Sequence, residues 1–94
     1  MTKAEIISDL LYEARRRLED LDEVADLEAD RTTWDAYVRQ QLGEGDDLAQ
    51  YNAGNAGGSL TSITDPEQRL TFARDLYLKD RERLTSIRRN MPQG

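Results

Sequence analysis

The chain contains no cysteine and no histidine, and these two absences exclude much of protein chemistry. Without cysteine there are no disulfides, thiolate metal sites or cysteine nucleophiles, and without histidine the usual neutral-pH base and metal ligand is missing. The remaining candidates, the carboxylates of Glu13 and Glu23 and the phenol of Tyr12, show no spacing that a reaction requires. We therefore expect no enzymatic activity, no cofactor and no bound metal ion.

Large apolar side chains are also scarce. Hydrophobic residues make up 37% of the 94 residues and charged residues 34%, whereas typical globular domains have about 45–50% and about 25%, with glycine counted among the former. The length fits one domain, and a domain this small buries only roughly 60–65% of the surface that its unfolded chain exposes. We expect oligomerisation or docking onto a partner to complete the core.

Long apolar runs are absent as well. None approaches the roughly 18 or more residues of a membrane span, and the start, residues 1–9, carries acid where a signal peptide would continue apolar. We expect a protein that stays in the cytoplasm where it is made and has no membrane partner.

The first half of the chain has helical periodicity. Apolar residues spaced alternately four and three apart predict an amphipathic helix over residues 2–29, with Thr2 and Glu5 forming a capping box at its start. The stripe lasts about three heptads, so a packed hairpin explains it as well as a coiled coil does. The three arginines at 15–17 are interpreted as partners of nearby acids within the helix rather than as a phosphate site.

A second, shorter helix is predicted over residues 33–42. Asp30, Thr32 and Thr33 weaken helix propensity and offer caps, which favours a break there over one long bent helix through residues 2–42. The apolar stripe starts at Trp34, and Gly43 can end the helix.

Glycine, asparagine and serine dominate residues 43–64, which we predict to be a long loop. It lacks the GxxxxGK[ST] pattern of a phosphate-binding loop and the DxDxDG core of an EF-hand. Its few large apolar groups could hold it against the body of the protein or against a neighbour.

The last helix is predicted over residues 66–91. Asp65 supplies an N-cap and Pro66 the first helical position. Asp80 falls where the stripe expects an apolar residue, so this stretch either faces water or pairs with an arginine. Acids interrupt the arginines of this helix, and we expect no specific nucleic-acid binding.

Charge is divided unevenly along the chain. Residues 1–47 contain six bases and fourteen acids, a net charge of −8, and residues 48–94 contain seven bases and five acids, a net charge of +2. Such a polarity can align copies head to tail or direct the basic helix to an acidic surface. Two solvated helix faces of different composition would give the same numbers.

These features predict an all-α fold, a small bundle or hairpin of two or three helices, that works by protein–protein contact. Aromatic and arginine side chains are common anchors of interfaces. Together with the apolar residues of the loop, they give the predicted interface residues: Trp34, Tyr37, Tyr51, Leu60, Ile63, Tyr77, Arg81 and Arg88.

The layout resembles one known family. The opening residues 2–11, a second helix with Trp34, a long loop and an arginine-rich last helix ending at residues 88–92 look like the small head-to-tail connector (adaptor) proteins of tailed bacteriophages. The resemblance implies a homo-oligomer, a ring beneath the portal, and a structural role in the virion without catalysis. The alternative is a small acidic regulator, such as an inhibitor or antitoxin-like adaptor, that binds one protein partner.

Overall fold

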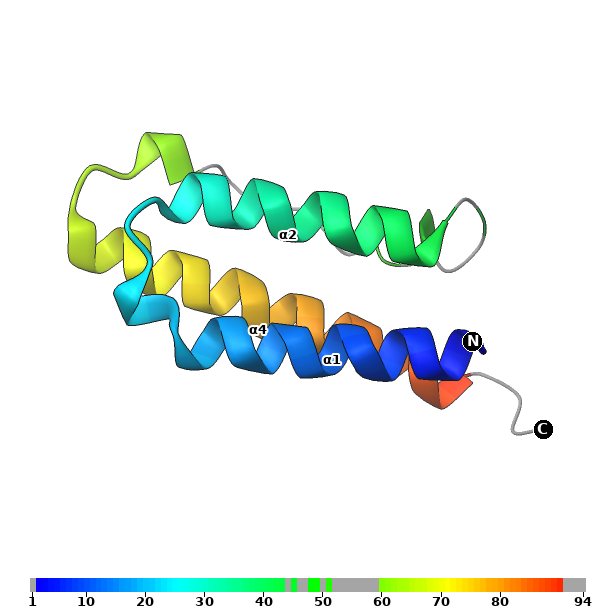
Figure 1. The fold of residues 1–94 in the computed structure, drawn as a ribbon. Helices are drawn as coiled ribbons and strands as arrows, with labels where there is room; N and C mark the ends of the chain where they lie inside the picture. The colour runs from blue at the N-terminus through cyan, green and yellow to red at the C-terminus, as the bar shows by residue number, and fades with distance from the viewer. Residues whose placement is uncertain (1, 44, 46–47, 50, 52–59, 91–94) are drawn as a thin grey trace.

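The computed structural model describes residues 2–43, 45, 48–49, 51 and 60–90. These residues form an all-α fold of three long helices, two short 3₁₀ turns and no strand (Figure 1). The helices lie side by side in a bundle whose longest dimension is 46 Å. The predicted fold class is confirmed.

Helix α1 spans Lys3–Glu19 and begins where its cap predicts. The Thr2 side chain accepts a hydrogen bond from the Glu5 amide at 3.2 Å, which satisfies one of the free donors of the first turn. One face of the helix is buried, with Ile7, Leu10 and Ala14 each at most 1% exposed. The amphipathic stripe read from the sequence is thus the face that packs inward.

The break between the first two helices lies earlier than predicted. Helix α1 ends at Glu19 rather than at residue 29, a 3₁₀ turn follows at Leu21–Glu23, and α2 spans Leu27–Leu42. The Asp26 side chain accepts a hydrogen bond from the Ala29 amide at 3.1 Å and so caps α2. This aspartate, rather than the threonines predicted to start the helix at residue 33, begins the second helix. Residues 30–33 lie within α2.

Helix α2 ends at Gly43, as the sequence predicts. This glycine has φ +68°, a left-handed conformation that glycine adopts without steric cost, and its amide donates to the Arg39 carbonyl at 3.0 Å. The end is therefore determined locally.

Helix α4 spans Pro66–Asn90 and is the longest element. The Asp65 carboxylate accepts from the Glu67 amide at 3.1 Å, and Pro66 occupies the first helical position, where no amide is needed. The predicted start is confirmed. The predicted last residue of this helix, residue 91, lies outside the described residues.

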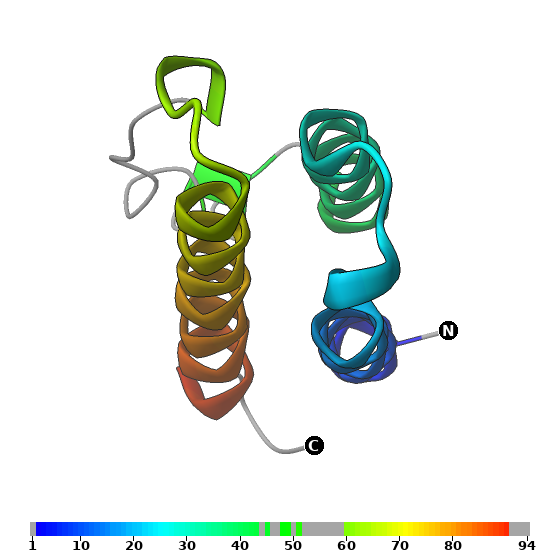
Figure 2. The same ribbon diagram turned by 90° about the vertical axis from the view of Figure 1, so that its left-hand side faces the viewer.

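Helices α2 and α4 run in the same direction, and both are antiparallel to α1 (Figures 1 and 2). The end of α2 and the start of α4 therefore lie toward opposite ends of the bundle (Figure 1). Within the predicted loop that connects them the described residues include helical positions at Leu48, Ala49 and Tyr51 and a 3₁₀ turn at Leu60–Ser62. Tyr51 and Leu60 are buried, so these two residues pack against the body of their own chain.

Contact within the bundle is uneven. Helix α4 packs along α1 more extensively than α2 packs on either helix. Helix α2 contributes two buried apolar residues, Trp34 and Val38, and the Trp34 ring lies 5.8 Å from the Tyr77 ring of α4. The core is formed by these residues: Ile7, Leu10, Ala14, Leu21, Trp34, Val38, Tyr51, Leu60, Ala73, Tyr77, Leu84 and Ile87.

Candidate functional site

The first candidate is a charged cluster inside the bundle, centred on Asp80 of α4. Asp80 is fully buried, and its Oδ2 accepts hydrogen bonds from Arg31 at 2.7 Å and from the Trp34 indole at 3.0 Å. Its Oδ1 accepts from Arg83 at 3.3 Å. A buried carboxylate is tolerated only when charged and polar donors compensate for lost water, and here both oxygens have such partners. The expectation that Asp80 pairs with an arginine is confirmed, and the alternative that it faces water is wrong.

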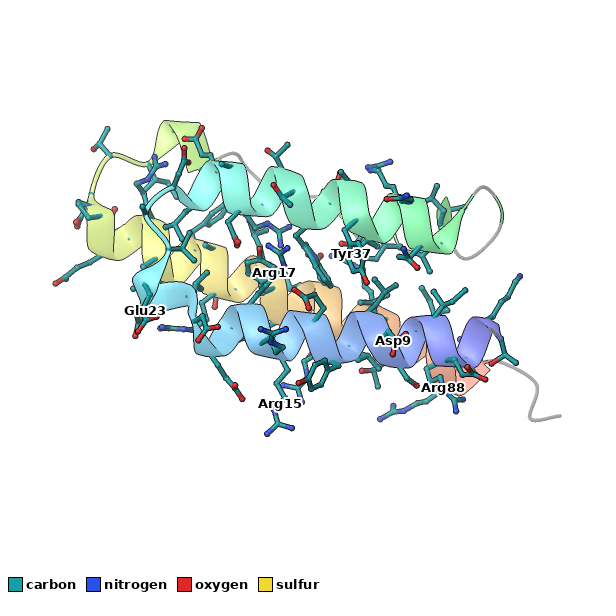
Figure 3. All side chains as sticks on the ribbon, viewed as in Figure 1. Asp9, Arg15, Arg17, Glu23, Tyr37 and Arg88 are labelled. Atoms are coloured by element: carbon teal, nitrogen blue, oxygen red, sulfur yellow. The ribbon has the colours of Figure 1, made fainter. Side chains whose placement is uncertain are left out.

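A second, partly buried pair joins α1 to α2. Arg17 donates to the Asp30 carboxylate at 2.8 Å, and the Tyr77 hydroxyl donates to the same carboxylate. Figure 3 shows Arg17 between the two helices, while Arg15 points away from them. The guanidinium of Arg17 also lies 5.7 Å from the Trp34 ring centre, within cation–π range. The two carboxylates therefore belong to one continuous polar layer across all three helices.

Two tyrosines complete this layer. Burial raises the pKa of Tyr77, and the hydrogen bond to Asp30 and the negative charge of Asp30 raise it further. Burial also raises the pKa of Tyr51, and the negative charge of Asp80 raises it further. Both phenols therefore stay protonated at neutral pH. Neither has the activated, ionised oxygen that a nucleophile needs.

The carboxylates of this layer accept hydrogen bonds from arginine, indole and phenol donors of the same chain. Glu13 pairs with Arg16 and Arg17, whereas Tyr12 and Glu23 are exposed. Among the described residues no group of three histidine, cysteine, aspartate or glutamate side chains is placed to hold a metal ion.

The arginines at 15–17 behave as predicted. Arg15 lies 3.2 Å from Glu19, and Arg16 lies 3.9 Å from Glu13. Arg17 reaches further, to Asp30 on the next helix, which the sequence did not indicate.

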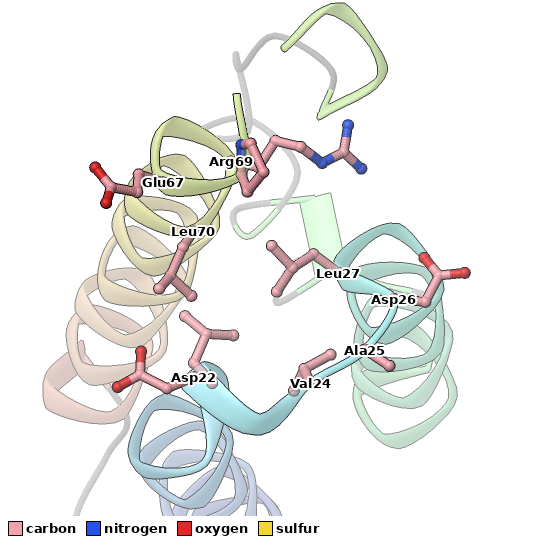
Figure 4. A pocket seen from close by; sticks show the side chains of 10 residues that line it. Asp22, Val24, Ala25, Asp26, Leu27, Glu67, Arg69 and Leu70 are labelled. Atoms are coloured by element: carbon pink, nitrogen blue, oxygen red, sulfur yellow. The ribbon is translucent and has the colours of Figure 1, made fainter. Parts of the chain in front are cut away.

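The second candidate is an open pocket of about 430 Å³ at the end of the bundle where α1 turns into α2 and α4 begins (Figure 4). Val24, Leu27 and Leu70 point into it from three segments of the chain, and Asp22 and Glu67 stand at its edge and point away. We call this site the acidic pocket and define it by its lining residues: Leu21, Asp22, Val24, Ala25, Asp26, Leu27, Pro66, Glu67, Arg69 and Leu70.

Acids outnumber bases around the acidic pocket, although Asp22 lies 3.1 Å from Arg74. Residues 19–28 contain six acids and no base. Arg69, the one base in the lining, is engaged elsewhere: it donates to Glu28 at 2.9 Å and to the carbonyls of Leu60 and Ile63, each at 2.8 Å. The pocket thus combines an apolar floor with a negative rim.

A third candidate lies on the outer side of α4. Leu78 is 41% exposed, and only one other large apolar side chain among the described residues, Tyr12, is more exposed. A groove beside it is lined by Leu78, Arg81, Glu82, Thr85, Ser86 and Arg89. No ion pair to another described residue is formed by Arg81 or Arg89. We call Leu78, Arg81, Thr85 and Arg89 the basic face.

The predicted interface residues divide into two groups. Four are buried in the core: Trp34, Tyr51, Leu60 and Tyr77. The other four are reachable to different degrees, with Arg81 exposed and the rest partly buried: Tyr37, Ile63 and Arg88. An interface role for the buried four stays a prediction, and it would require the helices to separate.

The sequence did not indicate the acidic pocket, because its floor comes from three segments that only folding brings together. It did contain a signal for the rim, namely the run of acids at residues 19–28. No helix in the described part of the chain has the length and apolarity needed to cross a membrane. Comparison with protein-family models, curated proteins and solved structures finds no match for this chain.

Proposed function

We propose that this chain is a non-enzymatic structural protein that assembles through protein–protein contacts, as a head-to-tail connector subunit of a tailed bacteriophage virion. The observation that carries the proposal is a pair of exposed surfaces, one at the start of α4 and one that extends from the middle of α4 toward its end. The acidic pocket and the basic face have opposite charge, and each includes an exposed or partly exposed apolar group. Such surfaces suit binding of other protein chains.

The interior supports a binding role over a catalytic one. An enzyme of this size would need a cleft with convergent reactive groups, and the polar groups that converge here do so in the core, where they pair with one another. The residues that line the acidic pocket and the basic face include carboxylates and arginines but no histidine or cysteine. These surfaces are therefore suited to binding another protein.

The connector assignment rests on layout and charge. The all-α bundle with a long connection before an arginine-rich last helix fits the resemblance drawn from the sequence. The net charge of −6 suits a subunit near packaged DNA, because a negative surface does not adhere to passing phosphate. As a homo-oligomer, the protein would contact neighbouring copies and structural proteins such as a portal.

A small regulator that binds one protein partner is the second candidate, and the acidic pocket favours it. An apolar floor with a negative rim would also accept a basic segment of a single target protein. The two candidates differ in stoichiometry: a connector is present in particles at a fixed ratio to capsid protein, whereas a regulator forms one discrete complex.

Density-gradient sedimentation of a lysate from the native source distinguishes them, with the protein followed across the fractions by mass spectrometry. We expect it to migrate with large DNA-containing particles at a constant ratio to capsid protein. Nuclease treatment before the gradient serves as the control, since material held only by free DNA would leave the particle fractions. Recovery near the top of the gradient with a single companion would overturn the connector assignment and support the regulator.

A further inference from the structure

We propose that the acidic pocket of one copy receives the basic face of a second copy, with Leu78 entering the pocket and Arg81 and Arg89 meeting its carboxylate rim. This inference rests on the proposed function, since it specifies one of the contacts by which the protein assembles. Its occupant is a second copy of this chain, and the argument for it is complementarity of charge and of apolar surface.

The floor of the acidic pocket is an apolar surface that another apolar side chain can cover. Leu21 forms its buried base, and Val24, Leu27 and Leu70 are only partly buried, so water reaches their side chains in the isolated chain (Figure 4). Covering this surface with an apolar side chain releases that water and is favourable in proportion to the area removed from contact with it. One leucine side chain is of a size that a pocket of about 430 Å³ holds.

One carboxylate of the rim has no ion-pair partner among the described residues, and the other has only an exposed one. The Glu67 side chain is exposed and makes no ion pair with another described residue. Asp22 lies 3.1 Å from Arg74, but their side chains are 71% and 44% exposed, so water already weakens this pair. An arginine from another chain can therefore pair with Glu67 directly and share Asp22 at little cost.

The basic face has the matching features. Leu78 places an apolar side chain beside two guanidinium groups that lack an ion pair among the described residues, Arg81 at one turn and Arg89 at three turns along the same helix. Glu82 in the same groove is the one opposing charge. Helical spacing thus places an apolar side chain at one end of a row in which the two arginines follow it along the helix.

The two surfaces cannot meet within one molecule. Both Glu67 and the basic face belong to α4, which spans Pro66–Asn90. Arg81 follows Glu67 by 14 residues and Arg89 by 22, which at 1.5 Å per residue are separations of roughly 21 Å and 33 Å along the helix axis. Contact between them therefore requires two copies. Because the surfaces are different, the contact is heterologous, and its repetition closes a ring or extends a chain.

Sedimentation velocity of the purified full-length chain over a concentration series, at low and at high salt, tests this contact. We expect wild-type protein to self-associate at low salt and to dissociate as salt screens the charges. Leu78→Ala should raise the dissociation constant about tenfold or more, because the buried apolar group is lost. Tyr12→Ala, which removes the other exposed large apolar side chain, is the matched control and should leave the dissociation constant unchanged.

Charge exchange tests the pairing of the two surfaces. D22K/E67K makes the pocket basic and R81E/R89E makes the helix face acidic, so each variant alone should stay monomeric. Mixing them should restore association, since each supplies the surface that the other lacks. The control E5K/D9K changes net charge by the same amount at the start of α1 and should associate like wild type. Circular dichroism of every variant confirms that helix content is retained.

The results separate this contact from the proposed function. A wild-type chain that stays monomeric at low salt, or one whose association is unaffected by Leu78→Ala and D22K/E67K, overturns the pocket contact. The connector assignment is decided independently, by co-sedimentation with particles. If mixing fails to restore association of the charge-exchanged variants although both are folded, the assigned pairing of surfaces is wrong.

Discussion

Along α1 the residues that meet α4 are apolar, whereas α2 is joined to the same helix largely by charges. Ile7, Leu10 and Ala14 are buried on α1, and on this part of the chain only Arg17 carries charge inward. Helix α2 contributes Trp34 and Val38 as buried apolar residues and adds the following polar partners: Glu28, Asp30 and Arg31.

The apolar contacts of α1 and the polar contacts of α2 contribute differently to the fold. Apolar contact is non-directional, so the α1–α4 pair supplies stabilisation but tolerates small shifts of one helix along the other. Ion pairs and hydrogen bonds are directional, and a one-residue slip of α2 would remove Arg31 and Trp34 from Asp80 together. We infer that the charges of α2 determine where it sits, a role that buried ionic groups have in some other helical proteins.

The largest effect is expected for Asp80→Ala. Its removal leaves Arg31 and the Trp34 indole without their buried acceptor, which should lower the free energy of unfolding by about 3–5 kcal/mol in urea denaturation followed by circular dichroism. Asp75→Ala, an exposed acid on the same helix, is the control and should change it by less than about 0.5 kcal/mol. Equal effects of the two substitutions would show that the buried pair does not attach α2.

A sharper test of the buried ion pair replaces both Asp80 and Arg31. The double variant Asp80→Leu with Arg31→Met leaves no unpaired charge of this pair, so it should recover much of the stability that Asp80→Ala loses. If the buried ion pair determines the position of α2, the amide NMR spectrum of the double variant should show broadened or doubled signals for α2, while the signals of α1 and α4 stay single. A spectrum as well dispersed as wild type would contradict this positional role.

Leu10→Ala tests the apolar side of the comparison. Leu10 is fully buried on α1, so truncation should lower the free energy of unfolding by about 2–5 kcal/mol, with little dependence on salt. Leu78→Ala is the matched control, since the same change at a 41% exposed position of α4 should cost less than about 0.5 kcal/mol. Similar costs at both positions would mean that the α1–α4 contact is not the main apolar core.

The next largest effect is expected at alkaline pH, where the free energy of unfolding should fall because of the buried tyrosines. Burial and Asp30 raise the pKa of Tyr77, so above pH about 10 the unfolded chain loses this proton while the folded chain keeps it. The stability is fully present below that pH and should fall above it by about 1.4 kcal/mol per pH unit for each buried tyrosine. Tyr51 adds a second contribution of the same sign. Urea titrations across this range should therefore give Tyr77→Phe roughly half the wild-type slope, and an unchanged slope would exclude Tyr77 as a cause.

The smallest effect is expected for an exposed ion pair on α2. Arg39 lies 2.7 Å from Asp35, as close as Arg31 lies to Asp80, but its side chain is 46% exposed. Arg39→Ala should lower the free energy of unfolding only slightly in thermal or urea unfolding, because water screens the pair. Arg31→Ala, at the buried pair of equal length, should cost several times more. Comparable losses would show that burial does not govern these ion pairs.

Local signals predicted the helix ends that depend on a few neighbouring residues. The caps at Thr2 and Asp65 and the glycine end at Gly43 all form as the sequence indicates. The break between α1 and α2 was misplaced, although Asp26 provided a signal for it. Asp and Thr both cap helices, and propensity alone does not decide which of two candidate sites is used.

The partner of Asp80 could not be predicted from the sequence, for a different reason. Its position in the apolar stripe of α4 indicated either exposure or pairing, and nothing in the local sequence identified Arg31, 49 residues away, as its partner. The acidic pocket has the same origin, since Leu21, Leu27 and Leu70 come from three segments. The sequence contained the acids of its rim but not the surface that they surround.

The sequence by itself determined that this protein is helical, where its first and last long helices begin, and which sides of them are apolar. These properties depend on caps, propensities and periodicities within one or two turns of helix. Only the tertiary structure decided that α2 lies parallel to α4, that Asp80 is buried against α2, and that a pocket opens at the acidic end. Those properties depend on which distant residues come within a few ångströms of one another, and that is settled by the packing of the whole chain.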